Sequence, residues 1–277
     1  MTDSFATGPA TDTAIETDYD LRFGGIRRLY GSHAVERFRR AHVVVAGVGG
    51  VGSWAVEALA RSGIGRLTLI DLDDVCLSNV NRQLHALDGT IGRPKVEVLA
   101  ERCRAIQPGI EVVTDAAFVT PTNLAERLPD DTDQVLDAID SVVAKAALIA
   151  WCKRRKLPIT VTGAAGGQTD PTRIRVADLA RTVHDPLLSR VRAQLRRDYG
   201  FTRDPKKRFG VESVFSDEQL VYPTPDGEVC HSKPAPGQST RLDCATGFGA
   251  ATFVTGTFGF VAASRVLARL ARDVTRT

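Results

Sequence analysis

The sequence lacks paired cysteines. Its five cysteines are scattered, and no two of them have the CxxC spacing that is common in metal sites. They are Cys76, Cys103, Cys152, Cys230 and Cys244. An odd, scattered set does not make a disulfide framework. Because Cys230 and Cys244 are not part of any pair, a tetrahedral zinc site with four cysteine ligands cannot form within one chain. We therefore expect a reduced protein without zinc.

An apolar leader is also missing. Residues 1–20 are polar and acidic, which is unlike a secretory signal and predicts an unstructured N-terminal tail. We expect a cytoplasmic protein. Residues 244–264 carry no charge, and such a stretch is long enough for a membrane helix. Its many glycines and threonines favour a buried or interface helix, and peripheral contact with a membrane is the alternative.

Short apolar runs rich in β-branched residues alternate with segments of helical spacing. We expect strands at 42–46, 66–71, 111–114, 134–136 and 158–162, and helices at 54–61, 95–106 and 141–155. Such alternation with short connections is typical of parallel sheets covered by helices on both faces. The fold class we predict is α/β, with a doubly wound, Rossmann-like, mostly parallel sheet.

The second half of the chain departs from this alternation. A strand at 173–176 and an amphipathic helix at 186–199 precede a turn-rich stretch over 209–239. We expect a single domain over 21–277. Within it, 21–165 would form a nucleotide-binding core, and 166–277 an extension for substrate and dimer contacts.

A glycine-rich turn joins the first predicted strand to the first predicted helix. Gly47, Gly49, Gly50 and Gly52 form the pattern GxGGxG there. Such glycines allow a tight turn and bring backbone N–H groups close to phosphate oxygens at the positive end of a helix. Asp71 ends the next strand, where a carboxylate binds ribose hydroxyls in this type of fold. These residues predict a nucleotide site.

Cations and a further carboxylate indicate which nucleotide binds. Arg82 and Lys95 suit a triphosphate, because charge moves onto pyrophosphate as it leaves. Asp140 follows another predicted strand, at the edge where ligands bind in such sheets. A carboxylate there suits Mg²⁺, which takes one or two carboxylates together with phosphate oxygens. The alternative for Asp140 is a cap on the helix that follows it.

Together these motifs resemble the ubiquitin-activating-type adenylyltransferases, which adenylate a carboxylate with ATP. The resemblance covers about 21–165. It rests on GxGGxGS from Gly47, DxD with SNxxRQ up to Gln83, GxPK up to Lys95, and DxxDS from Asp137. No separate domain with a catalytic cysteine is present in this sequence, unlike the large ubiquitin activators.

The resemblance also implies roles for single residues. Asp73 and Asn79 would shape the loop after the second strand, and Arg82, Gln83 and Lys95 would contact the phosphates of ATP. Asp140 would hold Mg²⁺.

A homodimer is a further implication of the family resemblance. In this family an arginine near the start of the chain reaches the ATP of the partner subunit. The matching position here is Gly25, so Arg22, Arg27 and Arg28 are the candidates.

Several segments outside the nucleotide core carry a further likeness, namely residues 22–31, 163–172, 185–187, 221–223 and 243–251. They resemble a branch of the family that acts on a modified adenosine in tRNA, and this resemblance extends over nearly 21–270. The net charge is only +3, but basic residues gather in 190–208 and suit contacts with tRNA phosphates. The candidates are Arg190, Arg196, Arg197, Lys206 and Lys207. A solvated charged face is the alternative for this segment.

Two other functions fit the same motifs. One is adenylation of the C-terminal glycine of a ubiquitin-like sulfur-carrier protein, with a sulfur-transfer system such as a cysteine desulfurase as partner and Cys230 or Cys244 as sulfur carrier. The other is a non-catalytic nucleotide-binding scaffold. The presence of Arg82, Lys95 and Asp140 together argues against the scaffold.

Overall fold

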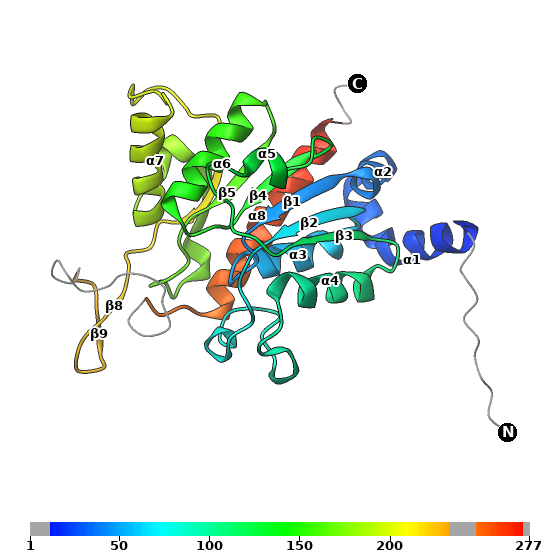
Figure 1. Cartoon of the computed structure of the whole chain (residues 1–277), viewed down its shortest axis with the longest axis horizontal. Coiled ribbons are helices and arrows are strands. Elements are labelled where there is room, and N and C mark those ends of the chain that lie inside the picture. Colours follow the sequence, from blue (N-terminus) through cyan, green and yellow to red (C-terminus); the bar gives the residue numbers. More distant parts are fainter. Residues whose placement is uncertain (1–11, 233–247, 274–277) are drawn as a thin grey trace.

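A seven-stranded sheet forms the centre of the molecule (Figure 1). The computed structural model describes residues 12–232 and 248–273. Strand order is β3-β2-β1-β4-β5-β7-β6, and all neighbours are parallel except the antiparallel pair β6 and β7. The strands are β1 (His42–Ala46), β2 (Arg66–Ile70), β3 (Glu111–Asp115), β4 (Gln134–Asp137), β5 (Ile159–Thr162), β6 (Ile174–Asp178) and β7 (Glu212–Ser216). The predicted doubly wound, mostly parallel sheet is confirmed.

Helices cover both faces of this sheet. One face is covered by α1 (Asp12–Tyr30), α2 (Ser32–Arg40), α3 (Gly52–Ala60), α4 (Lys95–Ile106) and α8 (Thr252–Asp273). The other is covered by α5 (Leu124–Arg127), α6 (Val142–Arg154) and α7 (Pro186–Asp198). Successive side chains of a strand point to opposite faces, so both faces of the sheet are apolar. In β1, Val43 and Val45 belong to the core on the first face, whereas Val44 and Ala46 belong to the core on the second.

Two segments differ from the sequence-based expectation. Strand β7 lies within the stretch predicted to be turn-rich, where it pairs with β5 and extends the sheet. Residues 12–20 are helical, so the expectation of an unstructured tail up to residue 20 was wrong for them. The buried Tyr19 side chain explains this, since its hydroxyl donates to the Gly63 carbonyl at 2.7 Å and its ring packs on Phe23.

The C-terminal helix α8 is a core helix. It starts at Thr252, later than the uncharged stretch suggested, and packs mainly against α3. Close approach requires Gly259, because a Cβ there would lie 2.6 Å from the Val51 carbonyl oxygen. In the part of the chain that the structure describes, α8 alone is long and apolar enough to cross a membrane. Since 56% of that apolar window is buried inside the protein, this is weak evidence for membrane contact.

A small hairpin lies apart from the main sheet. It consists of β8 (Tyr222–Pro223) and β9 (Val229–Cys230), and it lies at the lower left in Figure 1. Cys230 is therefore placed on this hairpin, and Cys244 lies outside the described residues.

Candidate active site

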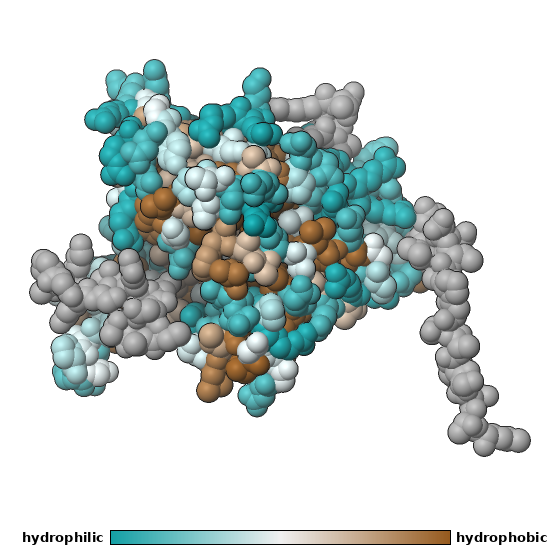
Figure 2. Space-filling model, viewed as in Figure 1, coloured by the Kyte–Doolittle hydropathy of each residue, from teal (hydrophilic) through white to brown (hydrophobic). Residues whose placement is uncertain are grey.

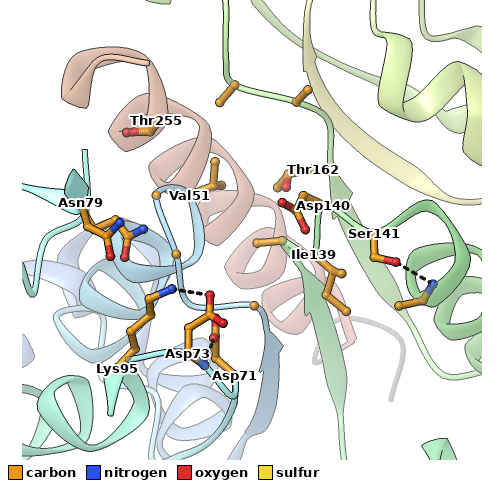
Figure 3. Close-up of a pocket in the computed structure, with 18 of the residues that line it drawn as sticks. Val51, Asp71, Asp73, Asn79, Lys95, Ile139, Asp140, Ser141, Thr162 and Thr255 are labelled. Carbon is orange, nitrogen blue, oxygen red and sulfur yellow. Dashed lines mark hydrogen bonds and ion pairs between the residues drawn. The ribbon is translucent and has the colours of Figure 1, made fainter. Parts of the chain in front are cut away.

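A pocket of about 930 Å³ opens at the carboxyl ends of β1, β2, β4 and β5. The strand order reverses between β1 and β4, which is where ligands bind in doubly wound sheets. The glycine-rich loop, the loop after β2 and the start of α4 line one side of the pocket. The turns after β4 and β5 line the other (Figure 3). Every residue predicted to contact ATP lines this pocket except Gly52.

The glycines have two different roles. Gly47 has φ +82°, and a Cβ there would lie 2.9 Å from backbone atoms of Ala138, so the chain can cross from β1 past β4 only with glycine at this position. Gly49 and Gly50 line the pocket. Gly52 instead packs inside the turn, where a Cβ would lie 1.9 Å from the Gly47 carbonyl oxygen.

The loop leaves the start of α3 open to the pocket. No side chain caps the first turn of α3, whose N-cap residue Val51 lines the pocket. The first N–H groups of a helix have no intrahelical acceptor and carry partial positive charge. This end of α3 can therefore bind an anion such as a phosphate group.

Asp71 links the two loops of the nucleotide side. One carboxylate oxygen accepts from the backbone N–H of Val48 at 2.8 Å, and the other accepts from that of Asp73 at 3.0 Å. Each oxygen has a second lone-pair direction for a ribose hydroxyl. Asp71 is thus held rigidly at the pocket wall, as the ribose role requires.

Lys95 and Asp73 form an ion pair in the pocket (Figure 3). Lys95 is the first residue of α4, and its backbone N–H donates to the Asp73 carbonyl. Its side chain is buried, and its ammonium group donates to the Asp73 carboxylate at 2.8 Å. Positive charge is therefore fixed beside the glycine-rich loop.

The segment after β2 brings three predicted residues together. Asn79 is buried and accepts from the Cys76 backbone N–H at 3.0 Å, so it closes the short helical turn Leu77–Asn79. The Arg82 guanidinium donates to the Ser78 carbonyl at 2.8 Å. The buried Gln83 has a side-chain oxygen with no hydrogen-bond partner among the described residues. Because Gln83 lines the pocket, a ligand bound there can supply the missing partner.

Asp140 lies on the opposite side of the pocket. It is exposed, and within residues 12–232 and 248–273 its carboxylate takes no partner. The helix cap is supplied by Ser141, whose hydroxyl accepts from the Ala144 N–H, so capping does not explain Asp140. A free carboxylate at the mouth of a phosphate site fits Mg²⁺, which completes its coordination with phosphate oxygens and water. The described residues include no cluster of three or more metal-binding side chains.

An ion pair behind Asp140 stiffens that wall. Lys145 and Asp137 are both fully buried, and the ammonium group lies 2.9 Å from the carboxylate. Burial raises the pKa of the Asp137 carboxyl, and the Lys145 charge opposes this rise. Because a buried charge without a partner is destabilising, this pair fixes the turn that carries Asp140.

Sequence reasoning missed several pocket residues. Thr255 and Ala250 reach the pocket from α8 and the segment before it, and Thr162 together with residues 163–166 forms the wall after β5. That wall is tied to α7 by Asp185, whose carboxylate accepts from the N–H groups of Ala164 at 3.0 Å and Leu188 at 2.9 Å. The sequence analysis did not assign these residues to the nucleotide site, because each position depends on a contact between segments far apart in the chain.

The five basic candidates for tRNA contact lie outside the pocket, on α7 and the loop after it (Figure 1). The surface over α7, at the upper left, is mainly hydrophilic (Figure 2), and in the loop after this helix Lys206 and Lys207 are exposed. Arg196 differs from them, because its guanidinium lies 5.3 Å from the centre of the Phe209 ring and donates to the Thr202 carbonyl. Arg197 is paired with the neighbouring Asp198, and Arg190 donates to the Pro186 carbonyl. The exposed lysines are thus the freest of the set.

The early arginines lie on α1, away from the pocket of their own chain. Arg22 pairs with Asp18 and donates to the Ile106 carbonyl, and Arg27 pairs with Asp20. That one of these arginines reaches a partner subunit stays a prediction.

Fold and site together define an ATP-binding adenylyltransferase of the ThiF family. Residues 25–275 match that family, and the chain belongs to it. The tRNA threonylcarbamoyladenosine dehydratase of Escherichia coli strain K12 is 54% identical over 255 residues, which covers 92% of this chain and 95% of the relative. A crystal structure of the Escherichia coli enzyme in complex with ATP aligns with a TM-score of 0.84 and 49% identity, covering 95% of this chain and 99% of that one. The molybdopterin-synthase adenylyltransferase of the same strain is 38% identical over 130 residues and covers 47% of this chain.

Proposed function

We propose that the protein is an ATP-dependent tRNA threonylcarbamoyladenosine dehydratase. The observation that carries this proposal is the extent of the similarity to the Escherichia coli dehydratase, which includes the extension after residue 165 and not only the nucleotide core. The similarity to the molybdopterin-synthase adenylyltransferase covers about half of the chain. Since the nucleotide core is common to the whole family, the extension is the part that distinguishes substrates.

The proposed reaction has two steps. The threonyl carboxylate of the modified adenosine attacks the α-phosphorus of ATP, and pyrophosphate leaves, which gives an acyl-adenylate. A nitrogen of the urea group in the same side chain then attacks the acyl carbon, a five-membered ring closes and AMP leaves. One carboxylate oxygen departs on AMP, and the nitrogen loses a proton, so the substrate loses the elements of water.

The side chains of the pocket suit the first step. Lys95 and Arg82 place positive charge where pyrophosphate develops its charge, and the open start of α3 adds backbone N–H groups. Asp71 would hold the ribose hydroxyls and so contribute to the binding of ATP. Asp140 would hold Mg²⁺, which neutralises phosphate charge when bound.

In the proposed reaction the nucleophile that captures the adenylate belongs to the substrate itself. Neither a carrier-protein tail nor a thioester is needed when the urea group captures the adenylate. Because tRNA is the substrate, we also propose a cytoplasmic location. Contact with a sulfur-transfer system stays a prediction, to be tested by adding a cysteine desulfurase to the assay.

We further propose that a homodimer is the active form and that an α1 arginine completes the partner's site. A mixing experiment tests this. Lys95→Ala chains and chains with Arg22, Arg27 and Arg28 all changed to alanine should each be inactive alone. In a mixed dimer one of the two sites has all its residues, so mixing should restore part of the activity. A mixture as inactive as its components would contradict the proposal.

The decisive test of function is mass spectrometry of nucleosides from tRNA incubated with the protein and MgATP. The modified nucleoside should lose the mass of one water, and pyrophosphate should form in equal amount. A parallel reaction with a small ubiquitin-like carrier protein should release no pyrophosphate. Pyrophosphate release with the carrier but not with tRNA would favour the sulfur-carrier function instead.

A further inference from the structure

The backbone carbonyl of Arg82 is held from two helices. The indole N–H of Trp54, on α3, donates to it at 3.0 Å, and the Thr255 hydroxyl, on α8, lies 3.2 Å from it. The indole has a single N–H, and among the described residues the Arg82 carbonyl is the one acceptor it bonds. The Thr255 hydroxyl also lies 3.3 Å from the carbonyls of Thr252, in α8, and of Ala251, just before it, so Arg82 is the nearest of the three acceptors.

Asn81 extends this contact to the Arg82 side chain. Its amide nitrogen donates to the Ala250 carbonyl at 2.8 Å, and its amide oxygen accepts from the Arg82 guanidinium at 3.0 Å. The Thr252 hydroxyl donates to the Asn81 carbonyl in turn. The start of α8 is therefore joined to the charged end of Arg82 through one side chain.

The glycine-rich loop meets the same point. A Cβ at Gly50 would lie 3.5 Å from both the Arg82 Cγ and the Thr255 methyl group. Gly256 faces the Trp54 ring, so α8 and α3 lie close enough for both helices to reach one carbonyl. Three segments distant in sequence thus converge behind a residue that lines the pocket.

We propose that Trp54, Asn81 and Thr255 are positioning residues that hold Arg82 in place for adenylation. The inference rests on the proposed role of Arg82 at the phosphates of ATP. A guanidinium on an exposed loop has many rotamers, and its effect on a developing charge depends on being placed in advance. The carbonyl contacts fix the loop backbone, and Asn81 fixes the guanidinium. The C-terminal extension thereby acts on the chemical step.

Three substitutions test this with little change of shape. Trp54→Phe removes the indole N–H but keeps an aromatic ring, Thr255→Val removes the hydroxyl, and Asn81→Ala removes the amide. Each substitution should lower kcat for pyrophosphate release about tenfold. A displacement of about 1 Å near the chemistry can cost about 10²-fold, and each substitution removes only part of the contacts that hold Arg82. The dissociation constant for ATP should change less than threefold, and Thr255→Ser should restore the wild-type kcat.

The chain contains matched controls. It has two tryptophans, and Trp151 lies on α6 under the Arg155 guanidinium. The Thr257 hydroxyl donates to the Phe253 carbonyl within α8, and in the described chain it has no other partner. Trp151→Phe and Thr257→Val should keep the wild-type kcat. If a positioning variant loses thermal stability but keeps its kcat, its role is in packing α3 against α8 and the proposal fails.

A double-mutant cycle with Arg82→Ala tests the role of Arg82 in adenylation separately from the positioning of Arg82 by its neighbours. If Trp54 acts through Arg82, Trp54→Phe should cause no further loss of kcat in the Arg82→Ala background. Full additivity of the two losses would overturn the positioning role. A wild-type kcat in Arg82→Ala alone would instead remove the proposed role of Arg82 itself.

Discussion

The ammonium group of Lys95 lies 2.8 Å from the Asp73 carboxylate, with 6% of the Lys95 side chain exposed and 57% of that of Asp73. The buried ammonium group of Lys95 therefore stays in the pocket. The exposed Asp73 carboxylate can move away from it, and solvent or a phosphate group can then take its place. We expect Lys95→Ala to lower the rate of pyrophosphate release about 10²–10³-fold, as for the loss of one fixed charge partner of a transition state. Lys95→Arg should not restore it, because a planar guanidinium does not fit a buried ammonium site.

The matched control for Lys95 is Lys156→Ala, a change of an exposed lysine distant from the pocket. Rates measured at saturating ATP should be unchanged in this variant. A wild-type rate in Lys95→Ala would contradict the phosphate role.

Asp140→Ala should abolish adenylation and leave the fold intact, because the carboxylate is exposed and free of protein partners in the described chain. Asp140→Asn should keep some activity but require more Mg²⁺, since an amide is a weaker ligand for a hard cation. The measurement is a magnesium titration of pyrophosphate release. Asp74→Ala, which removes another exposed carboxylate of the pocket, is the comparison and should leave the magnesium dependence unchanged.

Asp71→Ala should weaken ATP binding more than it slows the chemical step. Contacts with ribose are made equally in the ground state and the transition state, so their loss raises KM and leaves kcat nearly constant. Steady-state kinetics with varied ATP give both values. A fall in kcat at unchanged KM would show that Asp71 has a different role.

The basic residues on α7 and the loop after it should make tRNA binding depend on salt. Replacing Arg190, Lys206 and Lys207 with alanine should raise KM for tRNA, and each lost phosphate contact should reduce the slope of log affinity against log salt by about 0.7–0.9. Arg196 is left intact because it packs on Phe209. If these residues form only a solvated charged face, the slope should be unchanged in this variant. The control is Arg154→Ala on α6, which should also leave the slope unchanged.

His85 should make stability fall in mild acid. The ring is buried, neither nitrogen has a partner in the described structure, and burial lowers its pKa from 6.5 to about 4, with a smaller contribution from Lys95. Between these values the unfolded chain binds a proton that the folded chain does not. The free energy of unfolding should therefore drop as pH falls from about 6.5 to about 4, by roughly 3 kcal/mol in total.

Urea unfolding at pH 7 and pH 5 measures this contribution. His85→Leu should lose less stability than the wild type between the two values, because the titrating group is gone. The exposed His33→Gln is the control and should behave like the wild type. Equal pH dependence in all three proteins would contradict a buried neutral His85.

Local signals made the nucleotide core predictable from sequence. Helix α4 has the bounds that the sequence predicts, because Pro94 stops the preceding segment and apolar spacing begins at once. Strand β7 escaped notice because Ser213 and Ser216 are buried polar residues that interrupt the apolar pattern. The motif assigned Gly52 to the ATP site together with the other glycines. Its packing against Gly47 could not be predicted, because this contact exists only once the turn has folded.

Contacts between distant segments could not be predicted. Thr255 is more than 170 positions from Arg82, and nothing in the spacing of either residue indicates that they meet. The same holds for Asp185, which caps α7 and also holds the pocket wall at Ala164.

The position of α8 in the chain has a consequence for synthesis on the ribosome. This helix covers α3 and supplies Thr255, yet it is translated after every other element of the site. A nascent chain that has already emerged as far as β7 still exposes the apolar face of α3 and has an Arg82 loop without its tether. Pyrophosphate release by ribosome-bound chains should therefore begin only when the whole of α8 has emerged from the ribosome. Until then the exposed face of α3 is a target for chaperones.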